Sequence, residues 1–217
     1  MEALLARLEA VWSQATRIWV AGGWCMPPIA LTALVLFALG VHAHLELRAK
    51  GFLSVPERKW RGWIGDPGQR RGPIGELLDF VTDKRSLRDL AASFQEVRTT
   101  ELAPFERDLR LMRICISAAP LLGLLGTVTG MLATFEALAS GSGGEQTMGL
   151  VARGISEALI TTETGLVIAL PGVFFQYQLA RKFERYKAFL AHLETVCAQI
   201  LYRQLQQSGA AQASLSN

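Results

Sequence analysis

The apolar residues of this chain gather into three long stretches, at residues 23–44, 113–139 and 149–178. Each stretch reaches or exceeds the roughly 20 apolar residues that cross the hydrocarbon core of a bilayer as a helix. Charged residues are concentrated between and around the stretches. The pattern therefore predicts an all-α integral membrane protein with three transmembrane helices.

The remaining segments show an amphipathic pattern instead of a continuous apolar one. Residues 1–22 carry leucine, isoleucine and tryptophan on one side, which predicts a helix in the membrane interface or a packed cap on neighbouring subunits. After the third stretch, residues 179–207 repeat apolar positions at steps that alternate between four and three. Such a seam is typical of packed helices. We therefore expect the third membrane helix to extend into the cytoplasm and to dock on other helices or on its own subunit.

Three further segments complete the expected organisation of the chain. Residues 45–112 are predicted to form a large cytoplasmic helical segment, and residues 140–148 a short loop on the outer side of the membrane. The last segment, residues 208–217, is rich in serine and alanine and is predicted to be a disordered tail. The expected architecture is therefore three transmembrane helices with long cytoplasmic helical extensions.

The segment between the first two membrane helices holds most of the glycine and proline of the interior side. Trp60 and Trp63 lie among basic residues and are candidates to rest on the inner leaflet. Farther along, Thr99 or Thr100 is expected to cap a helix whose first turn contains Pro104. The apolar period continues from there, so this helix should run without a break into the second membrane stretch.

The distribution of charge predicts the topology. The formal net charge of +3 is too small to argue for nucleic acid as a partner. However, thirteen lysine and arginine residues lie between positions 45 and 112, and none lies in the loop at 140–148. Because basic residues accumulate on the cytoplasmic side, residues 45–112 and the C-terminus should be cytoplasmic. The N-terminus and the loop should then lie on the outer side of the membrane.

The sequence offers no pattern of catalytic or metal-binding residues. Cys25, Cys115 and Cys197 fall in or beside helical segments without metal-ligand spacing, and small apolar filler is the favoured interpretation. His42 and His44 have no carboxylate or thiol spaced to complete a metal site with them. We therefore expect no metal, no cofactor and no enzyme activity.

The second and third membrane stretches differ from the first because they carry glycines, threonines and carboxylates. Small residues let helix backbones approach closely, and the candidate packing positions are Gly123, Gly126, Gly130 and Gly165. Glu157 and Glu163 lie in the third stretch, where a charged carboxylate at mid-span costs about 2.5–3.5 kcal/mol. These groups should therefore face a hydrated interior or a polar partner. For each threonine, a hydrogen bond to a carbonyl of its own helix is an equally good alternative.

Two segments resemble those of a known family. One is residues 119–131, Ala-Pro-Leu-Leu-Gly-Leu-Leu-Gly-Thr-Val-Thr-Gly-Met, and the other is residues 154–171, Gly-Ile-Ser-Glu-Ala-Leu-Ile-Thr-Thr-Glu-Thr-Gly-Leu-Val-Ile-Ala-Leu-Pro. They resemble the second-span and third-span signatures of the ExbB/TolQ/MotA proton-channel family. Three spans, a large interior segment and a short outer loop resemble the ExbB/TolQ branch more than the four-span MotA branch.

The resemblance implies a specific assembly in the bacterial inner membrane. It implies a homopentameric ring around a dimer of single-span partners of ExbD/TolR type, which couples proton flow to work at the outer membrane. TonB-dependent uptake and Tol-type function both remain open, with a TonB-like or TolA-like protein as a possible further partner. Carried over by position, the proton-pathway residues are Thr127, Glu157 and Thr162.

Glu163 departs from the resemblance, because the family commonly has a small or uncharged residue there. It lies about 120° around the helix from Glu157 by the 3.6-residue period, so the two cannot face the same narrow pore. We expect Glu163 to be a buried, protonated carboxylate at a helix contact, within or between subunits. Two rival functions stay open: a self-sufficient ion channel or transporter, and a membrane scaffold in which glycines and threonines only pack helices.

Overall fold

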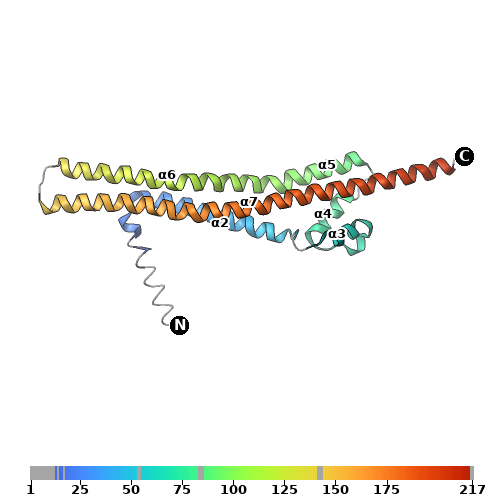
Figure 1. The fold of residues 1–217 in the computed structure, drawn as a ribbon, viewed down its shortest axis with the longest axis horizontal. Helices are drawn as coiled ribbons and strands as arrows, with labels where there is room; N and C mark the ends of the chain where they lie inside the picture. Colours follow the sequence, from blue (N-terminus) through green and yellow to red (C-terminus); the bar gives the residue numbers. More distant parts are fainter. Residues whose placement is uncertain are drawn as a thin grey trace, which may run out of the picture. The chain divides into compact units, whose positions relative to one another are not determined.

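The computed structural model describes Ser13 and residues 15–16, 18–52, 55–82, 86–140 and 144–215 (Figure 1). The described residues are almost entirely helical and contain no strand. The elements are η1 (Gly23–Cys25), α2 (Met26–Ala49), α3 (Glu57–Gly65), η2 (Pro67–Gln69), α4 (Gly72–Thr82), α5 (Leu87–Val97), the π-helix η3 (Arg98–Leu102), α6 (Ala103–Ala139) and α7 (Glu145–Leu215). The expected all-α class is confirmed for these residues.

Three helical runs in the described residues are long and apolar enough to cross a membrane. They are Gly23–Ala49, Leu87–Ala139 and Glu145–Gln207. Each contains an apolar stretch predicted from the sequence, so the expectation of three membrane-spanning helices is confirmed at the level of length and composition.

The chain divides into two compact units. The first unit comprises Met1–Gly40 and Arg110–Gln176, and the second comprises Val41–Leu109 and Tyr177–Asn217. The first unit holds the apolar, glycine-containing parts of α2, α6 and α7. The second unit holds the short helices and the basic segment that follows the third apolar stretch, where Arg181, Lys182, Glu184, Arg185 and Lys187 lie within seven residues. Because charges are expensive in hydrocarbon, we expect this part of α7 to lie outside the bilayer core.

Within the first unit, α6 and α7 approach each other closely at glycines from both helices. A Cβ atom added to Gly123 would lie 2.8 Å from the carbonyl oxygen of Thr161. A Cβ on Gly130 would lie 2.7 Å from the carbonyl oxygen of Gly154, and one on Gly165 would lie 2.6 Å from that of Ala119. Nonbonded carbon and oxygen atoms do not approach this closely without strain, so only hydrogen fits at these contacts.

Helix α2 packs on the same pair of helices through bulky side chains. A Cβ on Gly172 of α7 would lie 2.8 Å from Cδ2 of Leu36, which is fully buried, and 3.2 Å from Cγ1 of Ile116. Glycine in α7 thus provides the hollow that receives a leucine of α2. At this contact, glycine on one helix faces leucine and isoleucine on the other two.

In the second unit, α3 buries its two tryptophans. Trp60 and Trp63 lie three residues apart on one face of the helix, and only 2% and 5% of their surfaces are exposed. The indole ring of Trp60 meets the rings of Phe189 and His192 edge-on, with centroids 6.0 and 5.6 Å apart. The expectation that these tryptophans rest on the inner leaflet is therefore wrong, because α7 provides an aromatic surface that covers Trp60.

Arg70 binds the last carbonyl groups of α3. Its guanidinium donates to the carbonyl oxygens of Trp63 and Ile64 at 2.8 and 3.4 Å, and pairs with Asp79 of α4 at 2.7 Å. The last carbonyls of a helix lack partners within the helix, and a charged donor satisfies them. Arg70 thus ties α3 to α4.

The expected cap at Thr99 or Thr100 is absent, because the chain stays helical through this point. The π-helix η3 joins α5 to α6, and the hydroxyl of Thr99 donates to the carbonyl oxygen of Glu96 at 2.9 Å. Proline lacks an N–H group and its ring clashes with the carbonyl four residues earlier, and the wider π turn accommodates Pro104 at this point. The predicted unbroken run from Pro104 into the second apolar stretch is confirmed by α6.

Some segment ends differ from the expected ones. Helix α2 continues to Ala49, beyond the expected limit at 44. Helix α7 continues to Leu215, through most of the segment expected to be a disordered tail, because its three alanines favour a helix. The expected interfacial helix at 1–22 lies largely outside the described residues, which include Ile18–Ala21 in helical conformation.

Candidate functional site

Two consecutive threonines of α7 meet the same carbonyl group of α6. Thr161 is fully buried, and its hydroxyl lies 3.0 Å from the carbonyl oxygen of Ala158 and 3.4 Å from that of Gly123. The half-buried Thr162 donates to the carbonyl oxygen of Gly123 at 3.1 Å and lies 3.4 Å from that of Ala158. Each hydroxyl has one proton for several acceptors, so it can exchange a bond within α7 for a bond to α6.

Thr127 occupies a different environment on α6. It is half-buried, and its hydroxyl donates to the carbonyl oxygen of Leu124 in its own helix at 2.7 Å. The hydrogen bonds of the described residues do not join Thr127 to Thr162. Thr127 therefore adopts, within one chain, the self-satisfied geometry that was the alternative to a pathway role.

Glu157 points to the start of the first membrane helix. It is half-buried on α7, and its carboxylate lies directly against Gly23 of η1. The backbone carbonyl of Glu157 lies 3.2 Å from the hydroxyl of Thr161. The structure thus brings Glu157 and the threonine pair onto successive turns of one helix.

Glu163 lies on the outward face of the single chain. Its side chain is exposed, and so are those of Leu159, Leu166 and Leu170 at 65%, 48% and 71%. The three leucines follow the helical period, so the carboxylate stands in an apolar surface. Burial of Glu163 then requires another helix on this face, and its protonated state stays a prediction.

Of the four candidate packing glycines, Gly126 makes the contact that most directly involves the threonine pair. A Cβ on Gly126 would lie 2.5 Å from Cβ of Thr161 and 2.8 Å from its Cγ2. Gly123, Gly130 and Gly165 face backbone atoms, as described above. All four contacts lie between α6 and α7 of one chain.

Two residues near these groups were not candidates on sequence grounds. Consecutive threonines such as Thr161 and Thr162 give no signal in the sequence as to which one faces a neighbouring helix. Gly23 likewise shows no sign of its contact in the sequence. Its positive φ of +63° and the carboxylate against it become apparent only when α7 is placed beside η1.

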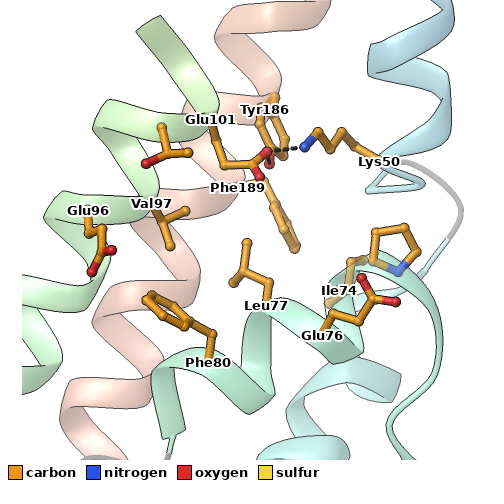
Figure 2. Close-up of a pocket in the computed structure, with 12 residues that line it drawn as sticks. Lys50, Ile74, Glu76, Leu77, Phe80, Glu96, Val97, Glu101, Tyr186 and Phe189 are labelled. Atoms are coloured by element: carbon orange, nitrogen blue, oxygen red, sulfur yellow. Dashed lines mark hydrogen bonds and ion pairs between the residues drawn. The ribbon is translucent and has the colours of Figure 1, made fainter.

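The second unit contains a cavity of about 370 Å³ between α4, α5, η3 and α7 (Figure 2). Its walls include the side chains of Ile74, Leu77, Val97 and Phe189. At one end Lys50 pairs with Glu101, and the hydroxyl of Tyr186 lies 3.5 Å from the same carboxylate.

The buried phenol at this end of the cavity is held neutral. Burial and the negative charge of Glu101 both raise the pKa of Tyr186 above its usual value of 10.0. Tyr186 therefore donates to Glu101 at physiological pH, and the carboxylate is shared between an ammonium group and a phenol.

The fold and this arrangement define a class of protein. It is an all-helical chain with three helices able to span a membrane, and one of them carries threonines and carboxylates where lipid would favour apolar residues. The chain belongs to the MotA/TolQ/ExbB proton channel family, whose sequence profile matches residues 73–191. This match includes Thr127, Glu157, Thr162 and Glu163, and it names a family of channels rather than of enzymes.

Individual relatives agree with the ExbB/TolQ branch. The chain is 48% identical over 71 residues to the putative biopolymer transport protein ExbB-like 1 of Synechocystis, covering 32% of this chain and 28% of that protein. It is 38% identical over 121 residues to the biopolymer transport protein exbB1 of Vibrio cholerae, covering 55% and 51%. It is 34% identical over 105 residues to the Tol-Pal system protein TolQ of Haemophilus influenzae, covering 48% and 45%. The matched part of this chain thus spans about half or less of each of these relatives.

Proposed function

We propose that this chain is the ring-forming subunit of a motor driven by the proton gradient across the bacterial inner membrane. In this proposal five copies surround a dimer of single-span partners of ExbD/TolR type. Proton flow along the ring is coupled to mechanical work at the outer membrane, through a TonB-like or TolA-like protein. The observation that carries the proposal is the row of Glu157, Thr161 and Thr162 on α7 in a chain of a proton-channel family.

The surface of a single chain supports an assembly. The outward face of α7 combines exposed leucines with the carboxylate of Glu163. Lipid would satisfy the leucines but not an ionised carboxylate. A neighbouring copy that covers this face would serve both, and would give Glu163 the buried, protonated environment expected from the sequence.

Thr127, Glu157 and Thr162 take the pathway roles in this proposal. Glu157 would hold or pass a proton at a hydrated position near the outer end of the third span. The hydroxyl of Thr162 would pass a proton by changing its hydrogen-bond acceptor from the carbonyl oxygen of Ala158 on α7 to that of Gly123 on α6. Both oxygens lie within hydrogen-bonding distance of it. Thr127 would contribute when its side chain turns away from the carbonyl of Leu124.

The proposed orientation follows from the charge distribution. Residues 45–112 and the C-terminal part of α7 would be cytoplasmic, and the N-terminus and the loop at 140–148 periplasmic. The thirteen basic residues of the first interior segment support this orientation.

The test uses the chain purified from the membranes of its own host together with whatever single-span protein accompanies it. Native mass spectrometry counts the subunits, and a pH-sensitive dye in proteoliposomes reports proton flux. We expect five copies of this chain, a partner dimer and a measurable flux. Flux from the chain alone would favour the self-sufficient channel, and no flux from the complete assembly would favour the scaffold.

Threonine variants separate a pathway role from a packing role. Thr162→Val keeps the side-chain shape and removes the hydroxyl, so flux should fall while assembly persists. Thr164→Val is the matched control, because Thr164 is also half-buried on α7 and, among the described residues, its hydroxyl donates to the carbonyl oxygen of Ile160 in its own helix at 2.7 Å and not to α6. Equal flux from the two variants, and normal flux from the Thr127→Val, Thr162→Val double variant, would reduce these threonines to packing elements.

A further inference from the structure

The contact between Gly23 and Glu157 joins the start of the first membrane helix to the proposed pathway. Gly23 opens η1 with φ of +63°, a left-handed conformation that glycine adopts at low cost. The Glu157 carboxylate fills the place that a side chain at position 23 would need. A Cβ built on Gly23 would overlap the carboxylate and would lie 3.2 Å from Cγ of Glu157.

The turn around Gly23 has little freedom to move away. A Cβ on the preceding Gly22 would lie 2.6 Å from Sδ of Met26 and 3.3 Å from Cγ2 of Ile160. The following Cys25 is 98% buried, and its thiol lies 3.9 Å from the hydroxyl of Thr129 on α6. The turn is therefore held against both α6 and α7, so any group added at position 23 must displace Glu157 instead.

We propose that Gly23 is a positioning residue for Glu157. The missing side chain and the left-handed turn together create the space that the carboxylate occupies. The direction of the Glu157 side chain is thus set by the first membrane helix of the same subunit. This inference rests on the proposed role of Glu157 in proton flow, and it adds that the role depends on a residue 134 positions earlier in the chain.

Gly23→Ala tests the proposal, with Gly72→Ala as the matched control. Both glycines have nearly the same φ, +63° and +68°, but no atom lies within 4 Å of a Cβ built on Gly72. Alanine therefore introduces the same backbone strain at both positions and displaces a neighbour only at position 23. We expect a severalfold loss of proton flux in Gly23→Ala and normal flux in Gly72→Ala. Equal fluxes in the two variants would overturn the proposal.

A shorter side chain at position 157 should relieve the effect of Gly23→Ala on proton flux. Aspartate at position 157 is one methylene group shorter, so its carboxylate carbon takes the place of Glu157 Cγ, 3.2 Å from the added Cβ, and its oxygens can rotate away from position 23. The Gly23→Ala, Glu157→Asp double variant should therefore conduct as well as Glu157→Asp alone, and it should assemble even if Gly23→Ala alone does not. If the double variant conducted less than Glu157→Asp alone, relieving the overlap with the carboxylate would not restore flux, which would overturn the proposal.

A cross-link distinguishes this inference from the proposed function. In a chain without the three native cysteines, the Gly23→Cys, Glu157→Cys pair should form a disulfide on mild oxidation, because a sulfur in the place of Glu157 Cγ would lie 3.2 Å from a Cβ at position 23. Absence of the cross-link would overturn the placement of Glu157 against Gly23. If the cross-link forms but Glu157→Gln conducts normally, the pathway role fails. If the cross-link forms and Glu157→Gln stops flux while Gly23→Ala matches Gly72→Ala, only the positioning role fails.

Discussion

Replacing Gly126 by alanine tests whether the approach of α6 to α7 depends on the absence of a side chain. The added Cβ would lie 2.5 Å from Cβ of Thr161 and 2.8 Å from its Cγ2. Carbon atoms in contact prefer about 3.5–4.0 Å, so the helices must separate by about 1 Å or Thr161 must rotate. Because Thr161 is fully buried and lies within hydrogen-bonding distance of both helices, either response loses contacts.

The matched control is Gly149→Ala on α7, where no atom lies within 4 Å of the added Cβ. Inside a helix, alanine is more favourable than glycine by about 1 kcal/mol, and this gain applies to both variants. Overpacking costs about 1–3 kcal/mol and applies only at position 126. The free energy of unfolding should therefore be about 1–3 kcal/mol lower in Gly126→Ala than in Gly149→Ala, because the shared gain cancels.

The measurement is unfolding of the purified chain in detergent with increasing dodecyl sulfate, followed by circular dichroism. Gly126→Leu adds three more carbon atoms at the same point, so we expect native mass spectrometry to find no ring. The argument would be refuted if Gly126→Ala were as stable as Gly149→Ala, or if Gly126→Leu still assembled. Either result would mean that the α6–α7 contact adapts to a side chain.

Three further predictions concern the carboxylates, the topology and a buried thiol. Glu157→Gln should impair proton flux while Glu163→Gln keeps flux and assembly, as read by the dye and by native mass spectrometry; the opposite result would make Glu163 the relay. In a chain without native cysteines, an impermeant maleimide added to intact spheroplasts should label Gln146→Cys but not Gln95→Cys, both of which replace exposed glutamines; external labelling at position 95 would reverse the assigned orientation. Burial raises the pKa of Cys197 from 9.0 to about 11, so its thiolate fraction at pH 8 falls about 100-fold. Iodoacetamide should then modify Cys197 slowly in the folded chain and rapidly after unfolding, as followed by mass spectrometry, and equal rates would contradict the burial.

The sequence predicted the long helices well because their signals are local. Apolar length alone identified the three candidate spans, and the period through Met112 and Ile116 correctly carried α6 through its full length. The π turn before Pro104 was missed, because a proline predicts a local disturbance but not whether the helix ends or widens there. The burial of Trp60 was missed because it depends on Phe189 and His192, which lie about 130 residues away in the chain.

The candidate site was predictable only in part. Composition and resemblance identified Thr127, Glu157 and Thr162, and their roles stay predictions. The pattern could not distinguish Thr161 from Thr162, because consecutive residues differ by only 100° around a helix whose rotation is unknown. The contact of Glu157 with Gly23 joins segments 134 residues apart, and no local pattern reports such a contact.

The exposed position of Glu163 has a consequence for biosynthesis. Each newly inserted copy that has not found its neighbours holds one carboxylate among leucines, at a cost of about 2.5–3.5 kcal/mol if the group stays charged. Orphan copies are therefore the least stable form of the chain, and we expect membrane proteases to remove them first. Overproduction of this chain by itself should shorten its half-life in pulse-chase experiments, so the cell would set the amount of assembled protein by degradation as well as by synthesis.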